Sequence, residues 1–213
     1  MINGLRIITN YTCNKRCSFC YQKSYEGVIN QYKLIDNLLR ISMQDHKFKH
    51  ITIMGGECTL LGEDLFYFIS AIKIIFPDVP ISITSNGSAD WTVYKRIINM
   101  NCSITISYNN ELDLIKFCDI PIRINLYGST DNMDIVAKLA KHYPVTICED
   151  IRCIDKPPLD IHGIECEEFE RVNNYTFKRK NVYYVKHNYD QDNIIITPTG
   201  LITTDFQDVV NGK

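Results

Sequence analysis

Short runs of β-branched and apolar residues alternate along this chain with longer stretches in which apolar residues recur every three or four positions. The short runs predict six strands, at residues 5–8, 51–54, 81–84, 103–107, 121–126 and 144–147. The longer stretches predict amphipathic helices, at residues 34–39, 65–76, 91–98 and 133–140. A further helical link over residues 109–119 is short and less regular.

Strands that alternate with helices favour parallel β-α-β units with right-handed crossovers. Such units build either a doubly wound sheet or an open or closed barrel, and the periodicity alone does not choose between these folds. Residues 1–148 form one continuous array of this kind, without a Gly/Ser-rich or Pro-rich linker.

The pattern changes after residue 148. Residues 149–166 read as a loop interrupted by two prolines, and residues 166–173 predict a short helix that begins with acidic residues. The segments 181–187 and 193–206 predict strands, the latter turning at Thr199 and Gly200 in a hairpin. We expect this extension to cover an open edge or the mouth of the array.

Composition adds few constraints. A net charge of −2 and a pI near 6.2 give no overall positive field, so neither a nucleic acid nor an anionic membrane is indicated as a partner. The chain has no run of eighteen apolar residues, and its first ten residues lack a signal-peptide pattern, so we expect a cytoplasmic protein. Nine cysteines in a reducing compartment indicate metal ligands or reactive thiols where they cluster, and buried small residues where they are scattered.

Three of these cysteines, Cys13, Cys17 and Cys20, directly follow the first predicted strand. Ligands gather at the carboxyl ends of strands in folds of this class. Three thiolates fit a [4Fe–4S] cluster in which one iron has no protein ligand. A zinc site that takes a fourth ligand from elsewhere, and three uninvolved thiols, are the alternatives.

A second motif, "MGGEC" at residues 54–58, ends the second predicted strand. Gly55 and Gly56 lack the Cβ atoms that would keep a ligand away from the backbone, and Glu57 offers a carboxylate to a cationic group. Alone, this pattern is most often a turn. Together with a three-cysteine loop one strand earlier, this Gly-Gly-Glu pattern is a specific signal.

With these two motifs the sequence resembles the radical S-adenosylmethionine (radical SAM) superfamily. "SNG" at residues 85–87 and "ISYNN" at residues 106–110 are similar to the "TNG" and "ISLDG" of many members, and the resemblance covers about residues 4–148. It implies a partial (β/α)6 barrel with a short C-terminal cap that contains a β-hairpin. The core would span residues 1–148, and the cap residues 149–213.

The resemblance also implies the site. Cys13, Cys17 and Cys20 would ligate a [4Fe–4S] cluster, and SAM would chelate the fourth iron. The other implied cofactor contacts are Phe19, Gly55, Gly56, Glu57, Asn86, Ser107 and, more weakly, Asn125. Structural alternatives exist for several of these: loop packing for the aromatic residue, and strand-end capping or internal hydrogen bonding for the polar ones.

The reaction that the resemblance implies is reductive cleavage of SAM to a 5′-deoxyadenosyl radical, which takes a hydrogen atom from the substrate. We expect a peptide or protein side chain as substrate, and a one-electron donor such as flavodoxin or ferredoxin as partner. The enzymatic alternatives are modification of a nucleotide or other small molecule, and activation of a glycyl-radical enzyme. The alternatives outside enzymes are an Fe–S electron carrier and a zinc-binding interaction module.

Departures from the family pattern leave some residues open. Cys58 stands where proline often follows the Gly-Gly-Glu motif, either as a catalytic hydrogen donor or, as we favour, as a buried thiol. Cys148, Cys153 and Cys166 resemble the ligands of auxiliary clusters but are too few for one, so we expect the hairpin to remain without the metal. The basic, tyrosine-containing segment 178–187 predicts a solvated strand face, with a grip on a phosphate or an acidic peptide as the alternative.

Overall fold

The computed structural model describes residues 4–17, 20, 26–108, 117–128, 133–149, 170–171, 176–179, 181–185 and 193–211. Several predictions lie outside these residues: the contact of Phe19, most of the helical link at 109–119, the loop with two prolines, and the metal-binding capacity of Cys153 and Cys166. Within the described part, no helix combines the length and the apolar character needed to cross a membrane.

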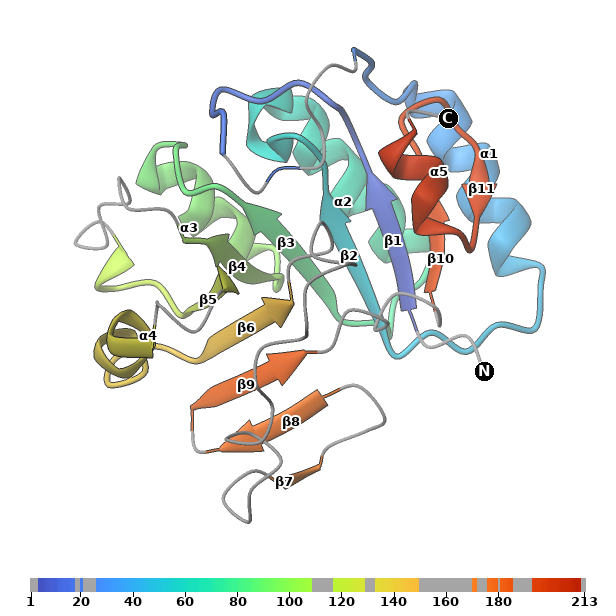
Figure 1. The fold of residues 1–213 in the computed structure, drawn as a ribbon. Coiled ribbons are helices and arrows are strands. Elements are labelled where there is room, and N and C mark those ends of the chain that lie inside the picture. The colour runs from blue at the N-terminus through green and yellow to red at the C-terminus, as the bar shows by residue number, and fades with distance from the viewer. Residues whose placement is uncertain are drawn as a thin grey trace.

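Six parallel strands form the centre of the sheet, and they lie side by side in the order in which they occur in the chain (Figure 1). They are β1 (Gly4–Ile8), β2 (His50–Met54), β3 (Ile81–Ser85), β4 (Ser103–Ser107), β5 (Ile122–Gly128) and β6 (Val145–Glu149). All six predicted strands are confirmed, and the mixed α/β architecture with a parallel, unclosed sheet agrees with the predicted partial barrel.

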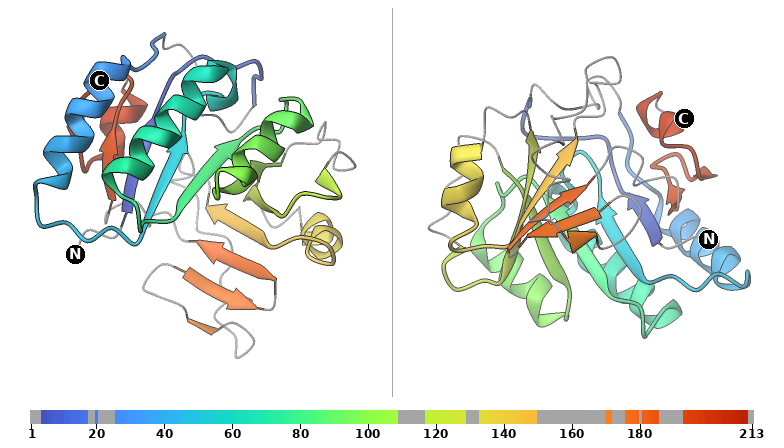
Figure 2. Two further views of the ribbon diagram at one scale, coloured as in Figure 1. Left: turned by 180° about the vertical axis from the view of Figure 1, so that it is seen from behind. Right: turned by 60° about the horizontal axis from the view of Figure 1, so that its bottom comes forward.

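Helices connect these strands where the periodicity predicted them. They are α1 (Gln31–Ser42), α2 (Glu63–Ile75), α3 (Trp91–Asn99) and α4 (Met133–Leu139), with a short 3₁₀ helix, η1 (Cys58–Leu61), before α2. Asn30 caps α1 by accepting from the backbone N–H of Tyr32, and Asp90 caps α3 by accepting from that of Thr92. Viewed from behind, α1, α2 and α3 lie in front of the sheet (Figure 2).

The C-terminal extension lengthens the sheet at both of its edges. β10 (Asn193–Ile196) pairs in parallel with β1 and turns through Thr197–Gly200 into the antiparallel β11 (Ile202–Thr203), so the predicted hairpin is confirmed. At the other edge, β9 (Val182–Val185) pairs in parallel with β6, followed by β8 (Thr176–Arg179) and β7 (Glu170–Arg171). The helix predicted over residues 166–173 is therefore wrong at the two positions of β7. The division into a core and a cap stays a prediction.

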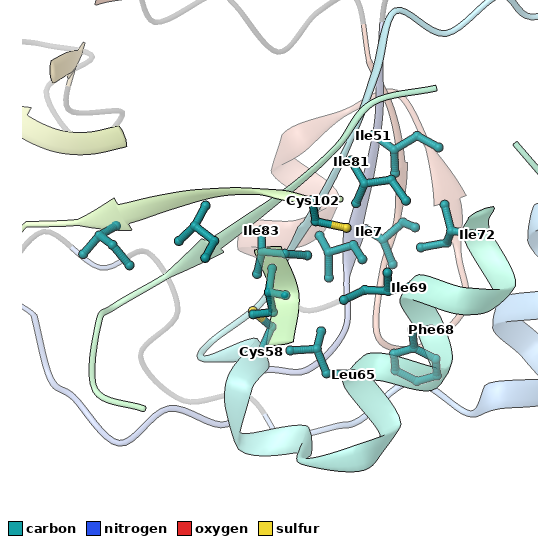
Figure 3. Close-up of a cluster of buried hydrophobic side chains, with 14 of the residues drawn as sticks. Ile7, Ile51, Cys58, Leu65, Phe68, Ile69, Ile72, Ile81, Ile83 and Cys102 are labelled. Carbon is teal, nitrogen blue, oxygen red and sulfur yellow. The ribbon is translucent and has the colours of Figure 1, made fainter. Parts of the chain in front are cut away.

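One face of the sheet, here called the outer face, carries the hydrophobic core. Side chains alternate between the two faces of a strand, and the outer-facing residues of β1–β6 are mostly isoleucines that pack against the helices. Figure 3 shows Ile7, Ile51 and Ile83 packed toward Leu65 and Ile69. This packing fixes the strands in register and therefore aligns the loops at their carboxyl ends.

The opposite face, here called the inner face, is largely polar. From the register and the alternation, its described positions in β1–β6 are Gly4, Arg6, Ile8, His50, Thr52, Met54, Ser82, Thr84, Ser103, Thr105, Ser107, Arg123, Asn125, Thr146 and Cys148. Only the corner at β1 and β10 is apolar, where Ile8 and Ile195 form a second cluster with Val209 of α5 (Phe206–Val210). The remainder of the inner face has no helix packed on it among the described elements.

Candidate functional site

The loop that follows β1 runs alongside the loop that follows β2. The N–H of Gly56 donates to the carbonyl of Asn10 (2.8 Å), and the N–H of Glu57 donates to the carbonyl of Thr12 (2.8 Å). These bonds continue the pairing of the two strands beyond their ends. The segment that carries the cysteines is thereby anchored immediately before Cys13.

The two glycines of the second loop allow this close approach. A Cβ atom built on Gly55 would collide with the Asn10 side chain, and one built on Gly56 would collide with the backbone of Thr12. From the sequence, we expected the missing Cβ atoms of Gly55 and Gly56 to leave space for a ligand. In the structure, the group that occupies this space is the neighbouring loop.

Asn10 is a residue of this site that the sequence reasoning missed. Its side chain is buried, donates to the carbonyl of Glu57 (3.1 Å) and accepts from the N–H of Gly56 (3.1 Å). Both loops are therefore tied by one amide. The available signal was a polar residue two positions after the end of an apolar strand and three positions before a cysteine motif.

The three cysteines lie on this anchored loop. Cys13 is exposed, Cys17 and Cys20 are partly exposed, and the N–H of Cys20 donates to the carbonyl of Cys17 (3.1 Å). Within the described ranges, no three His, Cys, Asp or Glu side chains are placed to hold a metal ion, so the three sulfurs share a loop without converging. Three accessible thiols on one anchored loop are a donor set that fits an iron–sulfur cluster, because ligands commonly converge when the metal binds.

Asn86, from the "SNG" segment after β3, reaches the cysteine loop. Its Nδ2 donates to Oδ1 of Asn14 (2.9 Å) and lies 3.6 Å from the sulfur of Cys13, as a weak hydrogen bond. Asn14 in turn donates to the hydroxyl of Ser88 (2.9 Å). The structure therefore brings Asn86 to the cysteine motif, as a residue that holds two loops together and donates to a sulfur.

Glu57 is buried, with 1% of its surface exposed, and its carboxylate is surrounded by donors of the chain itself. One oxygen accepts from the N–H (3.1 Å) and hydroxyl (2.6 Å) of Thr59 and from the hydroxyl of Ser85 (2.9 Å). The other accepts from the N–H of Asn86 (2.6 Å). Burial of a carboxylate is tolerated only with such compensation, so Glu57 fastens the end of β3 to the loop after β2. Its predicted contact with SAM stays a prediction.

This hydrogen-bond network continues to α3. The hydroxyl of Tyr94 lies 2.9 Å from that of Ser85, and it accepts from the N–H of Ala89 (3.3 Å). Burial raises the pKa of Tyr94 well above its usual range, against the opposing effect of the bond to Ser85. A neutral phenol of the outer layer thus supports, through Ser85 and Glu57, the loops that surround the cysteines.

Cys58 lies on the outer side as well. Its side chain is fully buried, beside Leu65 and Ile83 (Figure 3), and its thiol donates to the carbonyl of Thr84 (3.3 Å). Burial raises the pKa of this thiol, and the charge of Glu57 raises it further. These contacts describe a neutral, packed thiol. The catalytic alternative for Cys58 stays a prediction that none of them supports.

Ser107 and Asn125 are brought together on the inner face, where Ser107 is the last residue of β4 and Asn125 lies in the middle of β5. They face each other in register, and the N–H of Tyr108 donates to the carbonyl of Asn125 (2.8 Å). The next strand places Thr146 beside Asn125. Both predicted residues therefore lie at the same end of the sheet as the cysteine loop.

Of the three cysteines considered for an auxiliary cluster, the structure describes Cys148, which is partly exposed on β6. After the hairpin, Asp205 caps α5 by accepting from the N–H of Gln207 (2.9 Å).

The comparison with known protein families gives a match over most of the chain. The family model described as the Radical SAM superfamily matches residues 7–148, a range that contains all three cysteines of the motif and the strands β2 to β5 in full.

The curated relatives match over a shorter region. GTP 3′,8-cyclase of Campylobacter jejuni (strain RM1221) is 36% identical over 90 residues, which cover 40% of this chain and 28% of that protein. GTP 3′,8-cyclase of Nautilia profundicola is 28% identical over 92 residues, with the same coverage of 40% and 28%. The chain therefore spans 28% of the length of these relatives.

Solved structures resemble the chain in fold. SuiB of Streptococcus suis, bound to S-adenosylmethionine, has a TM-score of 0.64 at 12% identity and covers 97% of this chain and 60% of its own. The protein anSMEcpe with bound AdoMet has a TM-score of 0.54 at 16% identity, over 70% of this chain and 51% of its own. At such identities the likeness concerns the fold alone.

Proposed function

Because the chain belongs to the radical SAM superfamily, whose members use a [4Fe–4S] cluster and SAM, we propose that Cys13, Cys17 and Cys20 hold the cluster and that the surrounding loops hold SAM. When bound, these groups supply a 5′-deoxyadenosyl radical that abstracts a hydrogen atom from a substrate. The chain is thus a radical SAM enzyme. The assignment of residues within it is the proposal.

One observation carries this assignment: the cysteine loop is fixed to the two loops that follow β2 and β3. Backbone bonds from Gly56 and Glu57 hold it on one side, and the amide of Asn86 holds it on the other. A loop fixed in this way presents its thiols at a constant position relative to the strand ends. Such preorganisation limits the rearrangement needed on cofactor binding.

The remaining residues receive roles from their positions. We assign the backbone of Gly55, Gly56 and Glu57 to the amino group of SAM, and Ser107 and Asn125, which face each other in register, to its other polar groups. Asn86 both positions the loop and donates to the sulfur of Cys13. The assignment of Phe19 to the adenine rests on the sequence alone.

For the substrate, the sequence favours a peptide or protein side chain, by the motifs that this chain shares with peptide-modifying members. SuiB bound to a precursor peptide has the same fold, with a TM-score of 0.62. A nucleotide or other small molecule is the second candidate, because the curated relatives are named GTP 3′,8-cyclase. In either case a one-electron donor such as flavodoxin or ferredoxin would serve as partner.

The proposal is tested by anaerobic reconstitution with iron and sulfide, reduction with dithionite, addition of SAM, and detection of 5′-deoxyadenosine by liquid chromatography. We expect the product from the wild-type protein and none from Cys17→Ala. The matched control is Cys118→Ala, which removes an exposed thiol elsewhere and should retain the wild-type yield. Fully loaded wild-type protein that forms no 5′-deoxyadenosine, or protein that binds zinc without iron or sulfide, would contradict the proposal.

A further inference from the structure

In the central strands, the inner face carries charge of one sign. Its described positions in β1–β6 include two arginines, Arg6 and Arg123, and one histidine, His50, but no aspartate or glutamate. The whole chain, in contrast, has a net charge of −2. A surface that concentrates cations without carboxylates favours an anionic ligand.

Arg123, at the second position of β5, is the most informative of these residues. Its guanidinium lies over the ring of Tyr183 on β9, 4.7 Å from the ring centroid. A cation–π contact of this kind restrains the guanidinium above the ring, while its N–H donors can still reach other groups. The geometry therefore presents these donors above β9 on the inner face.

The pairing of Arg123 differs from that of the arginines on the helices. Arg40 of α1 pairs with Asp36 (2.8 Å), and Arg96 of α3 pairs with Glu63 (2.6 Å). Among the residues that the structure describes, Arg123 has no carboxylate partner and no hydrogen bond. Its charge is thus left available to a group from outside the chain.

Polar groups lie between the backbone of Arg123 and the ring of Tyr183. One row nearer the carboxyl ends, Asn125 lies beside Thr146, which is 7% exposed and is itself in register with Tyr183. Oδ1 of Asn125 and Oγ1 of Thr146 are buried and have no hydrogen-bond partner in the described part of the chain. Buried polar atoms without partners are uncommon, and this pair lies next to the unpaired cation.

We propose that the inner face binds a substrate through an anionic group, a phosphate or a carboxylate, and that Arg123 receives this group. The inference rests on the proposed function, because it takes the inner face as the place of the substrate. A guanidinium matches either oxyanion with two parallel N–H···O bonds. The hydroxyl of Thr146, in register with Tyr183, supplies a further donor beside it.

The position of Arg123 separates this role from binding of the SAM carboxylate. The guanidinium lies over Tyr183 of β9, and Tyr183 is in register with Asn125 across β6. Because neighbouring strands lie about 5 Å apart, a group held by this guanidinium lies roughly 10 Å to the side of one held by Ser107 and Asn125.

The test is calorimetric titration of the reconstituted protein, saturated with SAM, with two probes at fixed ionic strength: inorganic tripolyphosphate and triglutamate. We expect wild-type protein to bind one of them, which distinguishes phosphate from carboxylate. Arg123→Met should bind that probe about 10- to 100-fold more weakly, since hydrogen bonds to charged groups contribute at this level. Arg123→Lys keeps the charge but not the paired donors of the guanidinium. Its affinity for the probe should lie between those of the wild-type protein and Arg123→Met.

The matched control is Arg40→Met, which removes the same charge from the outer side and should bind like wild type. Three results would overturn the inference: no binding of either probe by wild-type protein, an equal loss in Arg40→Met, or a loss of SAM affinity in Arg123→Met. None of these changes the yield of 5′-deoxyadenosine from wild-type protein. Failure of the inference is therefore distinguishable from failure of the proposed function.

Discussion

The two faces of the central sheet are made by alternate residues of the same strands, yet they differ in almost every respect. On β3, Ile81 and Ile83 are buried against helices, while Ser82 and Thr84 face inward and remain partly exposed. On β4 the same alternation places Ile104 and Ile106 outward. Parallel sheets are usually apolar on both faces because helices cover both. Here one face holds the fold together, and the other is free to carry hydrogen-bonding groups.

The sharpest way to test this division is to truncate neighbouring residues of one strand. Ile83→Ala removes a fully buried outer side chain and should lower the free energy of unfolding by about 2–5 kcal/mol. Thr84→Ala removes an inner side chain that is partly exposed, and we expect a loss of less than about 1 kcal/mol. Urea denaturation under anaerobic conditions measures both. Equal losses would show that the inner face contributes to stability as much as the outer one.

Glu57 lies where the two faces meet, because its carboxylate joins the loops of the site to Ser85 and, through it, to the outer layer. Glu57→Gln replaces an accepting oxygen by a donor amide among four donors. This should cost about 1–3 kcal/mol in the free energy of unfolding.

The same substitution loosens the anchoring of Asn86, so we also expect a weaker response of the cluster's electron paramagnetic resonance signal to SAM. Glu63→Gln is the control, since Glu63 pairs with Arg96 at the surface and should contribute little. If Glu57→Gln were as stable as Glu63→Gln, the carboxylate would not be a support of the site.

Substitution of Cys58 tests whether this thiol, which is close to the site, belongs to the packed outer layer. Cys58→Ala should lower the free energy of unfolding by about 1 kcal/mol and leave formation of 5′-deoxyadenosine intact, since the side chain is enclosed in the core. Because burial raises its thiol pKa, alkylation of native protein at pH 8–9 should be slow at Cys58 and fast at the exposed Cys118. Loss of product in Cys58→Ala would instead support the catalytic alternative.

The smallest effect concerns His50, on the inner face. Its pKa is lowered, first by burial and then by the charges of Arg6 and Lys49. The unfolded chain therefore takes up a proton near the ordinary value of 6.5 before the folded chain does, and stability falls as the pH drops from that value through the folded pKa.

We expect His50→Gln to flatten this part of the pH profile of stability, measured by thermal unfolding between pH 7 and pH 5. The profile of Thr84→Ala should keep the wild-type slope, because that substitution removes no titrating group. An unchanged profile in His50→Gln would place the loss of stability at other residues.

Elements with their own periodicity were predictable from the sequence, and elements defined by a distant partner were not. The six central strands and α1–α4 each carry enough apolar residues to mark their boundaries within a few positions. β7 and β8 have two and four residues, and they exist because they pair with each other and with β9. That β10 would add to the edge beside β1 likewise depends on segments almost two hundred residues apart.

The candidate site, too, was predictable from the sequence only in part. The motifs predicted which residues gather at the strand ends, since the carboxyl ends of parallel strands meet at one edge. They did not reveal that Gly55 and Gly56 accommodate Asn10 and Thr12, nor that the carboxylate of Glu57 is taken by donors of the chain. These facts depend on distances between loops, which spacing in the sequence does not encode.

β1 obtains its second neighbour from residues 193–196, near the C-terminal end of the described chain. During synthesis on the ribosome, the first strand must therefore wait with one edge unpaired until residues 193–196 have emerged. An unpaired edge readily joins other chains, and contacts between such distant segments form slowly. The thiols that follow β1 thus receive their final support late, so iron loading should succeed best once these residues have been made.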